Sequence, residues 1–240
     1  MLLLVLAAPG ASALTVLYTA SLNGNLEGCG CRTRPRAGLA VRTAWLRSLP
    51  ERETALLIDG GNVLAGSGNR ALSREILEIY AELGYDAVAV GDLEIADAVD
   101  ALTAYRDPFA LISQNLALCI SSHCLMFSPE PVMLEKARSK VGVFALLDPK
   151  ALAVHPKEVT EDAKLIPPEL VAGTLVNQLA GQGAEWIVVL YHGPVKQAER
   201  LARLIRGIHL IVVANEQRSR VLGGLRCADQ TAKRSGGSWS

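Results

Sequence analysis

The chain has 240 residues, of which 24 are lysine or arginine and 24 are aspartate or glutamate, and half of all residues are apolar. This composition excludes a disordered or fibrous protein. The balanced charge gives no indication of a nucleic-acid or membrane-surface partner. A chain of this length can bury a large core as a single domain.

The first thirteen residues have the pattern of a secretory signal peptide, although the usual basic residues are missing. Leu2 to Ala8 form a short apolar run, and Ala11-Ser12-Ala13 has the small-x-small spacing that a signal peptidase accepts. We therefore predict a signal peptide over 1–13 and an exported protein, periplasmic or secreted. The alternative is an apolar first strand. No later apolar run is long enough to cross a bilayer as a helix, so no membrane span is expected after removal of the leader.

Behind the leader, apolar strand-like runs alternate with segments of helical periodicity. Because the apolar runs are continuous, the strands are expected to be covered on both faces, which predicts the α/β class. The segment 113–138 is expected to be an irregular excursion plus an edge strand. We predict one domain over 14–217 and an irregular tail over 218–240. The expected strands are 14–18, 55–58, 87–90, 141–147, 186–190 and 208–213, and the expected helices are 39–49, 76–83, a stretch through Tyr105, 171–179 and 201–205.

Short polar turns follow the predicted strands, and most of them contain glycine. In open α/β sheets, ligands bind at the carboxyl ends of the strands, so these turns are the expected place for a functional site. The turns are Thr19 to Gly24, Asp59 to Asn62, Gly91 to Glu94, Tyr191 to Gly193 and Ala214 to Gln217.

In this order, the five turns resemble those of the calcineurin-like metallophosphoesterases, and most closely those of the amino-terminal domain of 5′-nucleotidases. Supporting stretches are Ala37 to Arg42, Lys140 to Pro149 with His155-Pro156, Ala184 to Gly193, and Gly207 to Val213. The resemblance implies a four-layer sandwich of two β-sheets flanked by helices. It also implies phosphoester hydrolysis at two metals about 3.5–4 Å apart.

Most positions of the metal ligands that the resemblance implies hold other residues. The D-x-H motif appears as Ser21-Leu22-Asn23, and the bridging aspartate of D-x-G-D appears as Asn62. Asp92 and Leu93 stand where the G-N-H-E motif has its asparagine and histidine. The position of the last motif holds Asn215 and no histidine.

Only His192 and Asp92 remain as candidate metal ligands, in a site also lined by Ser21, Asn23, Asn62 and Asn215. Such a set could hold at most one divalent cation, so no fully occupied metal cofactor is expected. The alternatives are that His192 serves packing and that Asp92 caps the helix after it. Asp59 is expected to support the Gly60-Gly61 bend.

The five cysteines suggest disulfide bonds in an exported protein. Cys119 and Cys124 could pair with each other across a turn or with Cys29 and Cys31, whose C-G-C spacing disfavours a bond between the latter two. The C-G-C stretch is similar to one in a degenerate branch of exported 5′-nucleotidase-like proteins. His123 beside Cys124 leaves a thiol metal site as an alternative, although the spacing fits no standard zinc pattern.

A run of arginines follows the first turn. These side chains could bind an anion, because guanidinium groups match phosphate oxygens, or they could form a solvated loop. The run consists of Arg32, Arg34, Arg36 and Arg42.

Three functions remain open at this point. The preferred hypothesis is an exported, catalytically inactive binding module whose partner is a small phosphorylated ligand or an envelope protein. The first alternative is a divergent metal-dependent phosphoesterase or nucleotidase, and the second is a cysteine-centred redox or metal-binding protein. Because the strands that follow the last motif in the family have no counterpart here, either the second sheet is smaller or the reading frame is truncated or shifted.

Overall fold

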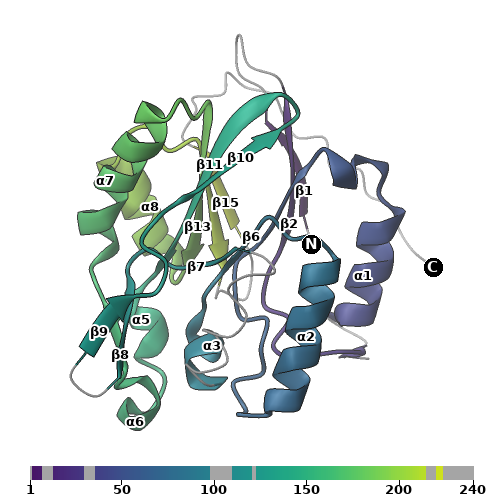
Figure 1. Cartoon of the computed structure of the whole chain (residues 1–240), viewed down its shortest axis with the longest axis vertical. Helices are drawn as coiled ribbons and strands as arrows, with labels where there is room; N and C mark the ends of the chain where they lie inside the picture. Colours follow the sequence, from purple (N-terminus) through teal and green to yellow (C-terminus); the bar gives the residue numbers. More distant parts are fainter. Residues whose placement is uncertain are drawn as a thin grey trace.

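The computed structural model describes residues 2–6, 13–29, 36–97, 110–120, 123–214 and 220–223. Two five-stranded sheets pack face to face, and helices cover their outer faces (Figure 1). The first sheet has the order β1-β2-β5-β6-β7, in which β2, β5, β6 and β7 are parallel. Its strands are β1 (Leu2–Leu6), β2 (Leu14–Thr19), β5 (Leu56–Asp59), β6 (Ala87–Ala89) and β7 (Leu111–Ile112).

The second sheet has three parallel central strands with an antiparallel strand at each edge. Every residue of the central strand β13 is buried, which agrees with its continuous apolar sequence. In sheet order the strands are β10 (Val132–Lys136), β11 (Ser139–Leu147), β13 (Trp186–His192), β14 (Leu210–Ala214) and β15 (Arg220–Gly223).

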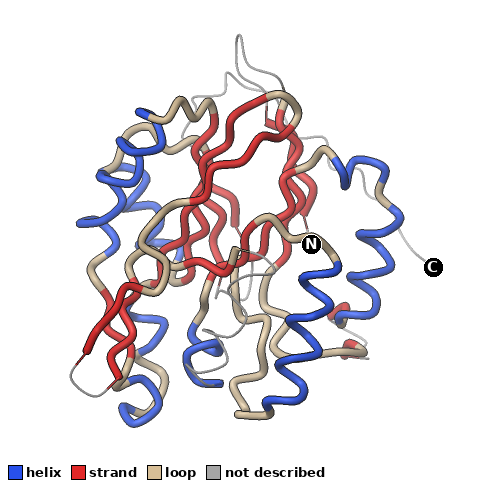
Figure 2. Tube along the Cα trace, in the orientation of Figure 1, coloured by secondary structure: helices blue, strands red, loops and turns tan. Residues whose placement is uncertain are grey.

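Four longer helices complete the layers. Helices α1 (Leu39–Ser48) and α2 (Arg70–Glu82) lie on one side of the strands, and α7 (Pro168–Gly181) and α8 (Val195–Leu204) lie on the other (Figure 2). Apolar side chains fill the space between the sheets and the space under each helical layer. The predicted four-layer sandwich is therefore confirmed.

Short elements join these layers. Among the described residues, no helix is long and apolar enough to cross a membrane. The expected helix through Tyr105 is present as α3 up to Asp97, and its remainder lies outside the described residues. The other short elements are η1 (Pro50–Glu53), α3 (Asp92–Asp97), α5 (Pro149–Leu152), α6 (Lys157–Thr160) and the paired strands β3 (Gly28–Cys29) and β4 (Arg36–Ala37).

The first strand coincides with the predicted leader. β1 runs antiparallel to β2 at the edge of the first sheet. Its Leu4 and Leu6 pack against the core between the sheets, whereas Leu3 and Val5 are 46% and 60% exposed. The alternative of an apolar first strand is thus realised in this chain, and cleavage after residue 13 stays a prediction.

The segment 113–138, which was expected to be irregular apart from an edge strand, contributes two strands to a third sheet. This sheet has the order β12-β8-β9, with β12 (Ala163–Leu165), β8 (Leu116–Ile120) and β9 (His123–Met126), and β10 is the expected edge strand. Cys119 and Cys124 lie opposite each other in the β8–β9 hairpin and form a disulfide bond. Of the two open pairings for these cysteines, the structure has the local one. Cys31, Cys227 and the Cys29 side chain lie outside the described residues.

The hairpin disulfide is expected to contribute modestly to stability because it closes a short loop. Replacing both Cys119 and Cys124 by serine should lower the free energy of unfolding by about 2 kcal/mol. Urea denaturation of the wild type and the variant, each with and without a reductant, measures the difference. A reductant that lowers the stability of the serine variant as much as that of the wild type would contradict this assignment.

Candidate functional site

The turns after β2 and β5 lie side by side at the carboxyl ends of these strands. The backbone N–H groups of Ser21, Asn23 and Gly24 donate to the carbonyl oxygens of Gly61, Asn62 and Val63 over 2.9, 2.8 and 3.0 Å. Ser21, Asn23 and Asn62 have left-handed backbones, with φ of 51°, 55° and 57°. Residues other than glycine rarely adopt this backbone conformation, and asparagine tolerates it better than most. Backbone strain of this kind concentrates at functional sites.

Glu94 of α3 ties the turn after β5 to the turn after β6. Its fully buried carboxylate accepts hydrogen bonds from the backbone N–H groups of Asn62, Leu64 and Gly91 over 2.8, 2.9 and 2.7 Å. Burial raises the pKa of Glu94, and these backbone donors act against the rise. The Glu94 side chain therefore holds the turns after β5 and β6 together.

Asp92, at the start of α3, is the centre of a buried side-chain network. Its Oδ1 accepts a hydrogen bond from Asn62 Nδ2 over 3.0 Å and lies 2.8 Å from His192 Nε2. Its Oδ2 lies 2.7 Å from His155 Nε2. The Asn62 amide is oriented by its second bond, because Asn62 Oδ1 accepts from the Leu93 N–H over 3.1 Å. The side chains of Asn62, Asp92, His155 and His192 therefore find their hydrogen-bond partners within this network.

The two ring nitrogens of His192 both face acceptors. Nδ1 lies 2.8 Å from the Gly60 carbonyl oxygen, which can only accept, so Nδ1 carries a hydrogen. Nε2 faces the Asp92 carboxylate and must donate as well. His192 is fully buried, and each of its ring nitrogens lies within hydrogen-bond distance of an oxygen that can accept. A metal-binding histidine uses a nitrogen lone pair, whereas here each ring nitrogen faces a hydrogen-bond acceptor.

The ionisation of Asp92 follows from the same contacts. Burial opposes its ionisation, but hydrogen bonds from His192 and His155, the charge of His192 and the Asn62 amide together lower its pKa to about 2. The carboxylate is therefore ionised at neutral pH.

The lowered pKa of Asp92 predicts an acid-sensitive contribution to folding. In the unfolded chain the pKa returns to about 3.9, so the contribution is fully present above that value and is lost as the pH falls through 2. Urea midpoints measured between pH 6 and pH 2 should fall more steeply below pH 4 for the wild type than for Asp92→Asn. Parallel profiles for the two proteins would contradict the assignment.

The structure brings together only some of the residues that the sequence singled out. Asn62, Asp92 and His192 are in hydrogen-bond contact, while Ser21 and Asn23 lie in the adjoining turn and Asn23 is exposed. Asn215, Arg32, Arg34 and the Arg36 side chain lie outside the described residues.

His155 is the network member that the sequence did not suggest as a site residue. It lies between α5 and α6, far along the chain from Asp92. The sequence indicates His155 only through the His155-Pro156 pair, which belongs to a stretch that resembles the phosphoesterase family.

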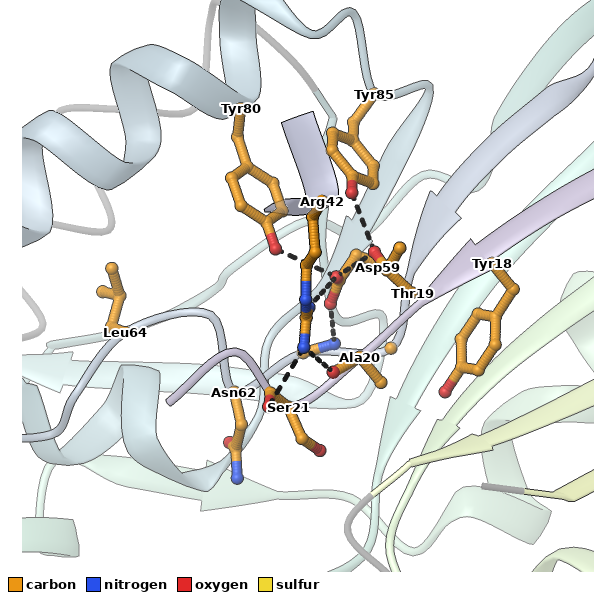
Figure 3. Close-up of polar contacts among 12 residues, drawn as sticks. Tyr18, Thr19, Ala20, Ser21, Arg42, Asp59, Asn62, Leu64, Tyr80 and Tyr85 are labelled. Carbon is orange, nitrogen blue, oxygen red and sulfur yellow. Dashed lines mark hydrogen bonds and ion pairs between the residues drawn. The ribbon is translucent and has the colours of Figure 1, made fainter. Parts of the chain in front are cut away.

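A second buried network lies behind the turn after β2 (Figure 3). The Arg42 guanidinium of α1 donates to the Ala20 carbonyl oxygen over 2.9 Å and lies 4.0 Å from Asp59 Oδ2. Asp59 also accepts from Tyr80 Oη over 3.1 Å and, as the sequence predicts, supports the bend by accepting from the Gly61 N–H over 2.8 Å.

This network corrects one sequence expectation. The Arg42 side chain is only 12% exposed and is directed at backbone carbonyl groups and Asp59, so it is not a receptor for an external anion. Its sequence position beside the other arginines gave no indication of this inward direction.

The residues present do not fit a pair of divalent cations. Asn62 directs its amide N–H towards Asp92, the Asp92 carboxylate contacts three side chains, and both ring nitrogens of His192 face hydrogen-bond acceptors. Within the described part of the chain, no group of three histidine, cysteine, aspartate or glutamate residues could hold a metal ion. No catalytic step through a metal is therefore derived for this site.

Comparison with known proteins identifies the scaffold, although no family model matches the chain. A snake venom 5′-nucleotidase from Gloydius brevicauda is 25% identical over 236 residues, covering 85% of this chain and 37% of that protein. The 5′-nucleotidase precursor of Thermus thermophilus superposes with a TM-score of 0.67 at 23% identity, covering 84% of this chain and 41% of that chain.

A second structure is matched over more of its length. The calcineurin-like phosphoesterase YfkN of Bacillus subtilis superposes with a TM-score of 0.65 at 20% identity, covering 83% of this chain and 71% of that chain. By contrast, the present chain spans just over a third of the curated relative from snake venom. The chain is therefore similar in sequence to a part of the snake venom 5′-nucleotidase, and it has the fold of the 5′-nucleotidase and calcineurin-like phosphoesterase structures.

Proposed function

We propose that this chain is an exported binding module in which an internal ion pair replaces the metal centre of the phosphoesterase scaffold, and that it does not hydrolyse phosphate esters. The observation that carries the proposal is the contact of both Asn62 Nδ2 and His192 Nε2 with one oxygen of Asp92. Hydrogen bonds occupy the atoms that would otherwise face a metal.

The chemistry of the replaced residues supports the same proposal. An amide at Asn62 lacks the negative charge with which a carboxylate bridges two dications. Leu93, which follows Asp92, has no proton to give to a leaving group. The module would instead use the turns at the carboxyl ends of the strands for recognition of a small phosphorylated ligand or an envelope protein.

Export is the second part of the proposal. It is supported by the apolar run and the Ala11-Ser12-Ala13 spacing of the leader, and by the disulfide bond between Cys119 and Cys124. The similar proteins named above include a snake venom protein and a precursor, which agrees with a protein that leaves the cytoplasm.

A divergent phosphoesterase is the competing function, because the superfamily scaffold and the buried Glu94 and His192 are retained. Both functions are tested by incubating the purified chain with manganese or zinc and assaying nucleoside monophosphates and p-nitrophenyl phosphate. We expect no turnover above that of His192→Ala, with the exposed histidine variant His123→Ala as the matched control. Turnover that needs metal, persists in His123→Ala and disappears in His192→Ala would instead establish the enzyme.

A cysteine-centred function is the remaining alternative, and the structure favours it only through the exposure of Cys124 in the hairpin. Thiol titration of the unfolded protein before and after reduction tests it. Reversible exchange of the Cys119–Cys124 bond with a dithiol under native conditions would support this alternative, and a resistant bond would leave it a structural role.

A further inference from the structure

We propose that the outer face of helices α7 and α8 binds the surface of a bilayer that contains anionic phospholipids. The two helices lie together on one side of the sheets (Figure 1). The proposal adds an interaction surface and does not depend on the Asp92 network. The face consists of the exposed cations Lys196, Arg200, Arg203 and Arg206 and the exposed leucines Leu170 and Leu204.

The cations form a stripe along α8. Lys196, Arg200 and Arg203 are spaced i, i+4 and i+7, so they share one side of the helix. Arg206 follows the end of the helix and is exposed like the other three. Among the described residues, none of these four side chains is in an ion pair, so their charges are available to an external partner. The opposite side of α8 is buried and consists of Val195, Ala198 and Leu201.

The positive charge of this stripe is a local property. The whole chain has equal numbers of basic and acidic residues, so a general positive charge does not explain it. Glu199 is the only acidic residue of α8, and Glu169 lies at the start of α7. Four cations beside two carboxylates leave the face positive, and such a face attracts a partner of opposite charge.

Two leucines of the same helical layer are largely exposed. Leu170 of α7 and Leu204 of α8 are 69% and 55% exposed, and Leu170 lies opposite the buried side of its helix. Leu204 and Arg200 line a small cavity together with Glu169, which precedes Leu170 in the chain. The start of α7 therefore lies beside the basic stripe, and one face presents both apolar and basic side chains.

This combination of side chains favours a lipid surface over an acidic protein. An acidic protein segment would match the cations alone. At the surface of an anionic bilayer, arginine and lysine bind the phosphate groups, and leucine enters the boundary of the acyl chains. Binding of this kind places the two helices on the bilayer surface and needs no membrane-spanning helix.

The test uses the full chain and sucrose-loaded vesicles, which carry bound protein into the pellet on centrifugation. One set of vesicles is pure phosphatidylcholine, and the other contains about one third phosphatidylglycerol. The first variant replaces Lys196, Arg200 and Arg203 by glutamine, and another carries Leu170→Ser with Leu204→Ser. All substituted side chains are exposed, so urea midpoints should match that of the wild type. The matched control, with the same change in net charge, replaces three exposed lysines of other elements by glutamine: Lys150, Lys157 and Lys164.

The wild type should bind the anionic vesicles at least about tenfold more strongly than the neutral ones, and added salt should weaken this binding. On anionic vesicles, the variant of the α8 stripe should bind at least about tenfold more weakly and the leucine variant about fivefold more weakly, whereas the lysine control should stay within about threefold of the wild type. Equal losses in the two triple variants, or no binding to anionic vesicles, would overturn the proposal. Full binding by the leucine variant, or capture by poly-glutamate in place of anionic vesicles, would indicate an acidic protein partner and would also overturn it.

Discussion

Replacement of Glu94 by alanine is expected to lower the free energy of unfolding by roughly 3–5 kcal/mol. Its fully buried carboxylate is the shared acceptor of the Asn62, Leu64 and Gly91 backbone N–H groups. Alanine would leave three donors without this acceptor and the left-handed Asn62 turn without its main support. The loss is large because a buried unsatisfied donor costs its full desolvation energy.

Urea denaturation at neutral pH measures this effect. The matched control is Glu78→Ala on α2, whose side chain is half exposed and pairs with Arg74 one helical turn away. That control should change stability by less than about 0.5 kcal/mol. If both variants lose the same small amount, the Glu94 carboxylate does not hold the turns together.

The second large effect is expected for Arg42→Met, with a loss of about 3 kcal/mol. The methionine keeps most of the apolar packing but removes the cation next to Asp59, which is fully buried. Burial raises the pKa of Asp59, and the Arg42 charge and the hydrogen bonds from Thr19, Gly61 and Tyr80 act against this rise. Without Arg42, the Asp59 carboxyl group and the Ala20 carbonyl group both lose a partner.

Arg47→Met, on the same helix, is the matched control because the Arg47 side chain is 58% exposed. It should be nearly neutral. A double variant with Asp59→Asn should lose clearly less stability than the sum of the single losses, because the two side chains act on each other. Additive losses would contradict the pairing that Figure 3 shows.

Much of the fold follows from the sequence, because its strands are continuous apolar runs that end in recognisable turns. The buried strands β5, β11, β13 and β14 lie where these runs predict them. The third sheet was not predicted, since β8, β9 and β12 are short. β8 and β9 form a local hairpin, but β12 pairs with β8 through a contact distant in sequence. The leader pattern could not distinguish a cleaved segment from a strand, because both are short and apolar.

The site was predictable in its location but not in its connections. Asn62, Asp92 and His192 follow the ends of predicted strands, and the fold brings these strand ends together. The contact of His155 with Asp92 depends on the path of the chain between α5 and α6, and the inward direction of Arg42 depends on the packing of α1. Neither can be read from residue spacing.

Metal content after dialysis against manganese or zinc tests the central claim most directly. The hydrogen-bonded ion pair of Asp92 and His192 predicts less than one equivalent of metal per chain, with no difference between the wild type and His192→Ala. Two equivalents per chain, lost in His192→Ala, would contradict the replacement of the metal centre and make the phosphoesterase function the leading one.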